Sequence, residues 1–228
     1  MLNRQPGDRT LPTLVTLLVI GLLLILNQDL WEPMVETVVL IIFATLVSLL
    51  IGVPIGMLQA ARRGRLADRI LTVATTAVYA APTFWIALAL VSLFTYGAAT
   101  MGLPAEWRLP AFGVRTPGVT LTGWAAVLDL IRHAILPVAI LAAVGAAGIA
   151  RYTRSSVADT LRLDYVRTAH AKGVGNRRIF LRHVLANILP ALVILFALSL
   201  PGLLAGSIFV ESVFAWPGLG RATLGAIL

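Results

Sequence analysis

The sequence has no cysteine and few charged residues, and each shortage narrows the class of protein. Without cysteine in its 228 residues, the chain forms no disulfide and offers no thiolate ligand to a metal. Charged residues make up 12% of the chain, whereas a soluble domain has about 25%. Hydrophobic residues reach 59%, as in proteins whose helices face lipid. The composition therefore predicts an integral membrane protein.

The common sequence motifs of catalysis are missing as well. The chain has no phosphate-binding G-x-x-x-x-G-K-[ST] run and no H-E-x-x-H zinc motif. Its three histidines, His133, His170 and His183, are scattered along the chain, and we interpret each as a surface or packing residue. The sequence predicts no catalysis, no metal and no cofactor in this chain.

Long apolar runs alternate with polar segments, which predicts a single all-α transmembrane domain over residues 1–228. The predicted membrane helices cover residues 11–31, 34–60, 70–96, 133–150 and 188–210. Residues 97–131 are then an outer loop, and residues 151–187 are a cytoplasmic loop. Pro54 and Pro82 fall inside predicted helices, where each predicts a bend.

The basic residues are distributed very unevenly among these segments. Fourteen of the 18 lie in residues 1–10, in residues 62–69 and in the 151–187 loop, and the remaining four lie in segments predicted to be outside. Cytoplasmic loops are enriched in lysine and arginine, so this bias places the N-terminus inside the cell. The net charge of +8 therefore reflects membrane orientation, and nucleic acid is not a predicted partner.

The most polar stretch lies within the 151–187 loop, from Asp164 to Pro190. Asp164 is the predicted N-cap of a short surface helix, and Gly173 is predicted to end it in a left-handed conformation. Asn176 is the predicted cap of a second helix that continues into the membrane. Residues predicted to share one face of the first helix are Leu161, Tyr165 and Ala169.

Small side chains at Thr168, Ala169 and Ala171 would give this surface helix a low profile suited to a groove on another protein. The alternative is a solvated basic loop that only obeys the positive-inside rule. The stretch resembles the cytoplasmic coupling loop of ABC-transporter permease subunits, in particular those of dipeptide, oligopeptide and nickel importers. The resemblance also covers A-P-T-F-W at 81–85 and V-E-S-V-F-A-W-P-G-L-G at 210–220.

This resemblance implies a type I importer permease fold and a function without catalysis. The chain would be a multi-pass protein of a bacterial or archaeal inner membrane, forming the path for a peptide-like or related small solute. It would pair with a second permease subunit, identical or homologous, and with an extracytoplasmic solute-binding protein. Two partner subunits would bind and hydrolyse ATP, so no cofactor is expected here.

The resemblance also assigns roles to individual residues. The coupling residues would be Asp164, Tyr165, Arg167, Thr168, Ala169, Ala171, Lys172 and Gly173. The residues of the translocation path would be Pro82, Trp85, Gly202, Gly206 and Ser207. For each path residue, ordinary helix packing is the competing interpretation.

Three other functions stay open at this stage: an osmoprotectant permease of the same superfamily, a secondary carrier or channel without an ATPase, and a membrane scaffold. The family pattern has a sixth helix after the Trp-Pro-Gly run, whereas this sequence ends at Leu228. We therefore expect a sequence truncated at its C-terminus, with five helices present.

Overall fold

The computed structural model describes residues 28–104 and 107–227, except for the side chains of residues 28–29, 199–201 and 203–205. Every regular element in this part of the chain is a helix, which confirms the predicted all-α class. The first predicted membrane helix, residues 11–31, lies outside the described residues except for its last four. Those four form the first turn of α2, which covers Gln28–Ala61 and contains Pro33 and Pro54.

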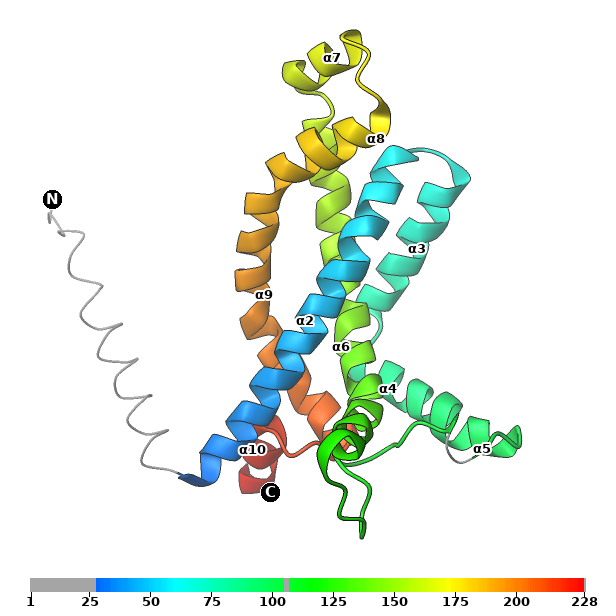
Figure 1. Cartoon of the computed structure of the whole chain (residues 1–228), viewed down its shortest axis with the longest axis vertical. Helices are drawn as coiled ribbons and strands as arrows, with labels where there is room; N and C mark the ends of the chain where they lie inside the picture. Colours follow the sequence, from blue (N-terminus) through cyan, green and yellow to red (C-terminus); the bar gives the residue numbers. More distant parts are fainter. Residues whose placement is uncertain (1–27, 105–106, 228) are drawn as a thin grey trace, which may run out of the picture.

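Helix α6, Gly123–Thr160, is the central element of the bundle, and α2 packs along much of its length (Figure 1). The prediction of a helix over 133–150 was too short by ten residues at each end. Charged residues such as Asp129 and Arg154 made the ends resemble loops. They are compatible with helix, however, because a helix can extend beyond the hydrocarbon layer into a polar environment.

The predicted helix over 70–96 is wrong, because the chain breaks at Ala81 and Pro82. Both residues have extended backbone, with ψ of 137° and 130°. Proline lacks an N–H and disfavours helical geometry at the preceding residue, so Pro82 ends one helix instead of bending it. Helix α3 covers Leu66–Ala80, and α4 covers Thr83–Val91. After α4 the chain continues without a break as a π-helical segment, η2 (Ser92–Gly97), and then as α5 (Ala98–Thr100).

The predicted loop over 151–187 contains more helix than expected. After α6 come α7 (Asp164–Ala171), α8 (Asn176–Arg178) and a π-helical segment, η4 (Ile179–Val184). Helix α9, Leu185–Val213, then replaces the shorter predicted helix over 188–210. A final helix, α10 (Leu219–Ile227), was not predicted.

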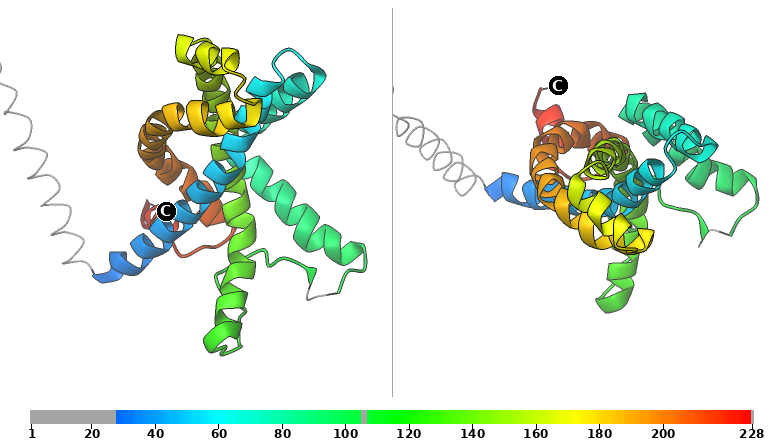
Figure 2. Two further views of the ribbon diagram at one scale, coloured as in Figure 1. Left: turned by 45° about the horizontal axis from the view of Figure 1, so that its top comes forward. Right: turned by 90° about the horizontal axis from the view of Figure 1, so that it is seen from above.

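Four described helical segments are long and apolar enough to cross a membrane: Leu30–Ala61, Thr83–Thr100, Gly123–Thr160 and Asn176–Leu198. We refer to the two ends of the bundle as the α7 end and the α10 end (Figure 1). The arm formed by α4, η2 and α5 begins with α4 packed on α6 and α9, and its far end projects away from the bundle (Figure 2). One buried apolar cluster lies toward each end, and Val166 of α7 belongs to one while Trp216 belongs to the other.

Candidate functional site

The segment with the predicted coupling function projects from the α7 end, farther out than the turn between α2 and α3 (Figure 1). Helix α7 buries Val166 and Ala169 against Val157 of α6 and against Ile179 and Val184 of η4. The other side chains of α7 are exposed. Burial of one apolar face holds the helix on the bundle, and a fully buried valine such as Val166 contributes about 1.5–3 kcal/mol.

The predicted start of α7 was wrong in its detail. Leu163 is the N-cap, with no side-chain hydrogen bond at the cap, and Asp164 is the first helical residue. Asp164 instead lies 3.6 Å from the Arg167 guanidinium, and both side chains are largely exposed. Exposed pairs of this kind contribute about 0–1 kcal/mol. An acidic residue in the first turn still interacts favourably with the helix dipole.

The predicted end of α7 at Gly173 is confirmed. Gly173 has φ of +76°, and its N–H donates to the His170 carbonyl at 2.9 Å. The Val174 N–H donates to the Ala169 carbonyl at 3.1 Å. These two bonds form a Schellman motif, which satisfies carbonyls that would otherwise lack a partner. A left-handed residue at this position favours glycine because other residues meet a steric penalty there.

The predicted faces of α7 need correction. Leu161 precedes the helix as the C-cap of α6, and Tyr165 is exposed, so these residues do not share a face with buried Ala169. The buried stripe is Val166 and Ala169, three residues apart. Of the small residues expected to form a low knob, Thr168 and Ala171 are exposed, whereas Ala169 faces the bundle.

The second predicted cap, Asn176, is also wrong, because Gly175 is the N-cap of α8. The Asn176 Oδ1 instead lies 3.2 Å from His170 Nε2, which connects α7 to α8. The Tyr165 hydroxyl donates to the His183 carbonyl at 3.5 Å, a second and weaker connection. These two contacts connect α7 to α8 and to η4.

An ion pair that sequence analysis missed joins α3 to α6 near the α7 end. Arg154 donates from Nε and a terminal nitrogen to the two carboxylate oxygens of Asp68, at 2.8 and 2.9 Å. The Gly64 N–H donates to the same carboxylate at 2.9 Å, which also fixes the turn between α2 and α3. Because 86 residues separate the partners, no local pattern in the sequence could have identified the pair.

Asp68 should make stability depend on pH. The hydrogen bonds from Arg154 lower its pKa from 3.8 to about 2, so the ionised form is favoured in the folded state. The ionised Asp68 contributes about 2 kcal/mol to the free energy of unfolding. This contribution is complete above about pH 4 and is lost as the pH falls toward 2. We expect Asp68→Asn to lower the melting temperature at pH 7. Between pH 4 and 2, the melting temperature of the variant should fall less than that of the natural chain, because the variant has no carboxylate to protonate at this position.

The control for that measurement is Asp159→Asn, since Asp159 is exposed on α6 and is in none of the ion pairs found in the described chain. Heat-induced unfolding of the detergent-solubilised chain would be followed from pH 7 to 2 for both variants. Equal melting temperatures for the two variants at pH 7 would contradict the stabilising role of Asp68.

At the α10 end, the run from Val210 to Gly220 forms a compact turn around a buried acid. Glu211 is fully buried, and its Oε1 accepts a hydrogen bond of 2.8 Å from the Thr37 hydroxyl of α2. Its Oε2 accepts from the Arg221 N–H at 3.1 Å, and Thr37 Oγ1 accepts from the Leu219 N–H at 2.8 Å. Side chains from α9 and α2 thus cap the start of α10.

The glycines and aromatic residues of this run have definite packing roles. A Cβ on Gly218 would lie 2.5 Å from Thr37 Oγ1, and one on Gly220 would lie 2.6 Å from the Ile208 Cα. Phe214 and Trp216 are buried in the apolar cluster of this end, beside Val210 and Leu40. Ala215 between them has φ of +50°, a left-handed value that forms the sharp turn. The motif therefore joins α9, α10 and α2.

Comparison with known proteins decides the family. The family described as "Binding-protein-dependent transport system inner membrane component" matches residues 52–228. This chain belongs to that family. The match includes both the predicted coupling segment and the Val210–Gly220 run, so the resemblance seen in the sequence is confirmed.

Curated relatives of this family member are peptide-transport permeases. It is 36% identical over 186 residues to the oligopeptide transport system permease protein AppB of Bacillus subtilis, covering 82% of this chain and 55% of AppB. It is 37% identical over 183 residues to OppB of Mycobacterium tuberculosis, covering 80% and 55%. It is 31% identical over 219 residues to the dipeptide permease DppB of Escherichia coli, covering 86% and 62%. The chain thus spans somewhat more than half of these relatives.

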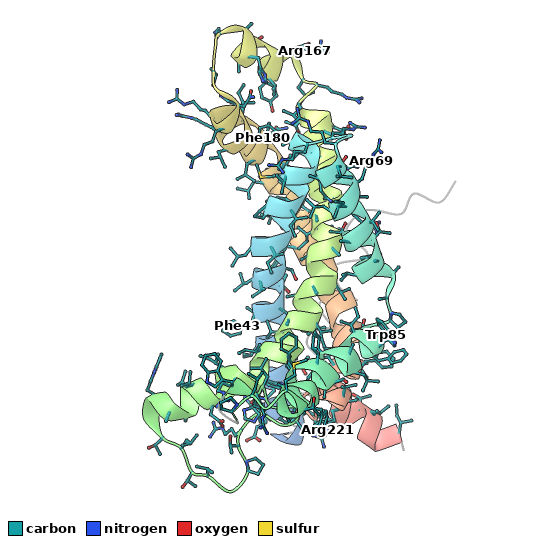
Figure 3. All side chains as sticks on the ribbon, turned by 90° about the vertical axis from the view of Figure 1, so that its right-hand side faces the viewer. Phe43, Arg69, Trp85, Arg167, Phe180 and Arg221 are labelled. Atoms are coloured by element: carbon teal, nitrogen blue, oxygen red, sulfur yellow. The ribbon has the colours of Figure 1, made fainter. Side chains whose placement is uncertain are left out.

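The five candidate path residues of this family member lie on two packed helices but not on one surface. Helices α4 and α9 contact each other. Pro82, Trp85 and Gly202 are exposed, and Trp85 points outward from α4 (Figure 3). Gly206 is half-buried, and Ser207 is buried within the bundle. The structure therefore separates Ser207 from the three exposed residues, and the path assignment stays a prediction.

In residues 28–104 and 107–227, no three His, Cys, Asp or Glu side chains are grouped to hold a metal ion. His133 is buried, and its Nδ1 lies 2.8 Å from the Asp129 carbonyl oxygen of its own helix. Asp129 in turn accepts hydrogen bonds from the backbone and hydroxyl of Thr116, at 2.8 and 2.6 Å. These contacts attach the loop before α6 to the bundle.

Proposed function

We propose that this chain is the permease subunit of an ATP-driven importer and forms part of the path for a peptide-like solute. The observation that carries the proposal is the exposed α7, which is closed by a Schellman motif and held on the bundle by a buried apolar face. A helix fixed in this way can transmit the motion of an attached partner to α6 and α9. The peptide-transport names of the relatives favour this solute class over osmoprotectants.

The distribution of charge supports a cytoplasmic location for the α7 end. The turn between α2 and α3 carries Arg62, Arg63 and Arg65, and the α7–η4 segment adds further basic residues at the same end. The α10 end has Arg108, Arg115, Arg132 and Arg221. By the positive-inside rule, the more basic end faces the cytoplasm of the bacterium or archaeon.

The proposed assembly places different tasks in different subunits. Two ATP-binding subunits would contact α7 and hydrolyse ATP, since this chain lacks a phosphate-binding loop. A second permease subunit would complete the path across the bilayer, and an extracytoplasmic binding protein would deliver the solute. ATP can shift the bundle between two states only through different affinities of the ATPase for those states. The permease itself would catalyse no reaction.

The coupling surface can be tested by cysteine crosslinking, because the natural chain has no cysteine. We expect Ala171→Cys, on the exposed face of α7, to crosslink to the co-expressed ATPase subunit with a short thiol-reactive linker. The matched control is Ala169→Cys, two residues away and only 8% exposed, which should crosslink weakly or not at all. The crosslinked product would be identified by mass and by an antibody to the ATPase.

Two outcomes would contradict the proposal. One is the absence of any crosslink from Ala171→Cys in a complex that still contains the ATPase. The other is solute uptake by the purified chain alone in an ion gradient, which would indicate a secondary carrier. A complex that assembles and crosslinks but takes up a betaine instead of peptides would correct only the solute class.

A further inference from the structure

Three arginines surround a hollow just before α9. Arg177, Arg178 and Arg182 line a space of about 690 Å³, and the remaining lining residues are Gly175, Asn176 and Leu181. All three arginines are exposed. None of the ion pairs among the described residues involves these arginines, so no described acidic side chain lies within 4 Å of their guanidinium groups. The hollow is therefore strongly positive and uncompensated within the described residues.

The hollow lies at the level where the apolar part of α2 ends. Helix α8 lies near the level at which α2 ends and turns into α3, while α7 lies farther out (Figure 1). Phe180 of η4 is likewise closer to the level of Arg69 than Arg167 of α7 is (Figure 3). The apolar run Leu30–Ala61 ends at this level. With Leu30–Ala61 taken as a membrane span, the arginines lie at the level of the lipid headgroups.

An apolar groove begins one helical turn beyond the arginines. It has a volume of about 600 Å³, and its lining is entirely hydrophobic: Leu46, Leu49, Leu50, Val53 and Pro54 from α2, and Leu185, Leu189, Leu192, Val193 and Phe196 from α9. From Leu185 to Phe196 the helix rises about 16 Å, roughly half of a 30 Å hydrocarbon core. The groove is therefore as long as one leaflet is deep.

We propose that this surface binds an anionic phospholipid from the leaflet on the α7 side. The lipid phosphate lies among the three arginines, and one acyl chain occupies the groove between α2 and α9. Guanidinium groups suit phosphate because they offer several N–H donors in a fixed plane. Basic residues next to a membrane helix attract anionic lipid headgroups. This proposal does not depend on the transported solute or on ATP.

A lipid fits both parts of the surface, whereas an acidic protein segment fits only one. A protein partner could neutralise the arginines from the aqueous side. It would leave uncovered an apolar groove that runs along the helices into the membrane. The exposed Leu181 and Leu189 continue the apolar surface from the arginine hollow into the groove. The hollow, followed along the chain by the groove, therefore matches a charged head with an attached hydrocarbon chain.

The test measures lipid binding to the full chain purified in detergent. Phosphatidylglycerol and phosphatidylcholine would be titrated separately, and bound lipid would be counted by native mass spectrometry. We expect phosphatidylglycerol to bind more tightly to the natural chain. The triple variant Arg177→Gln, Arg178→Gln, Arg182→Gln should weaken that binding on the order of a hundredfold, with little change for phosphatidylcholine.

Two further variants keep the test specific. Arg62→Gln, Arg63→Gln, Arg65→Gln removes the same charge from an exposed turn at the same end, and it should retain the preference for phosphatidylglycerol. Val193→Trp fills the groove and leaves every arginine in place, so it should weaken binding of both lipids. Unchanged phosphatidylglycerol binding by the 177–182 variant, or an equal loss in the 62–65 variant, would overturn the proposal. A complex co-expressed with the ATPase subunit gives one further outcome: a 177–182 variant that loses the ATPase but still binds phosphatidylglycerol would assign the surface to a protein and overturn the proposal.

Discussion

Replacing Gly56 by alanine is expected to destabilise the bundle by about 2–3 kcal/mol, the upper part of the range for overpacked cores. A Cβ at this position would lie 2.5 Å from the Ala150 carbonyl oxygen and 2.6 Å from the Thr153 Cβ. The oxygen belongs to the backbone of α6 and cannot rotate away, so α2 and α6 would have to separate. Their contact is the most extensive among the described helices, and a small shift there affects the packing of both.

The loss would be measured as the midpoint of heat-induced aggregation of the detergent-solubilised chain. Gly202→Ala is the matched control, because Gly202 lies in another apolar helix and a Cβ there meets nothing within 4 Å. Alanine is a better helix former than glycine by about 1 kcal/mol, so the control should be neutral or slightly stabilising. Equal midpoints for the two variants would show that the α2–α6 approach is looser than the structure indicates.

Replacing Glu211 by leucine should destabilise the α10 end by about 3 kcal/mol, because two hydrogen bonds are lost in a buried site. The Arg221 N–H and the Thr37 hydroxyl would both lose their acceptor. Glu211→Gln should have a smaller effect, since its amide keeps one acceptor oxygen but presents donors to the other partner. Helix α10 is expected to detach before the rest of the bundle unfolds.

Trypsin reports this local opening directly, because Arg221 lies in the first turn of α10. Cleavage after Arg221, identified by mass spectrometry, should become faster in the order natural chain, Glu211→Gln, Glu211→Leu. Glu32→Gln is the control, an exposed acid on α2 whose replacement should leave the cleavage rate unchanged. Equal cleavage rates in the natural chain and Glu211→Leu would mean that the buried acid does not hold α10.

Local patterns in the sequence predicted the end of α7 correctly and its start wrongly. Gly173 was expected to end α7 in a left-handed conformation, and its φ of +76° confirms this. This succeeded because the requirement concerns the backbone of one residue and its near neighbours. Asp164 and Asn176 were wrongly predicted as caps, because both lie in the first turn of their helices and not at the cap position. An acid or amide beside a helix start is compatible with the cap position and with the first turn, and sequence does not distinguish the two.

Pro82 shows the limit of hydrophobicity as a guide. Residues 70–96 are apolar enough for one membrane helix, yet the chain turns at Ala81 and Pro82 and continues as a separate arm. An apolar composition is equally compatible with a bent helix and with two helices. Which of them forms depends on whether α6 and α9 offer a surface to the second segment, and α4 packs on both.

The sequence by itself determined that this chain is an all-helical membrane protein of the binding-protein-dependent transport family, with its basic residues in a few segments. Composition and local motifs carry that information, because lipid demands long apolar helices. Only the tertiary structure decided that Asp68 meets Arg154, that Glu211 caps α10 with Thr37, and that an arginine hollow adjoins an apolar groove. The two hydrogen-bonded pairs join residues 86 and 174 positions apart, and such contacts depend on how whole helices pack.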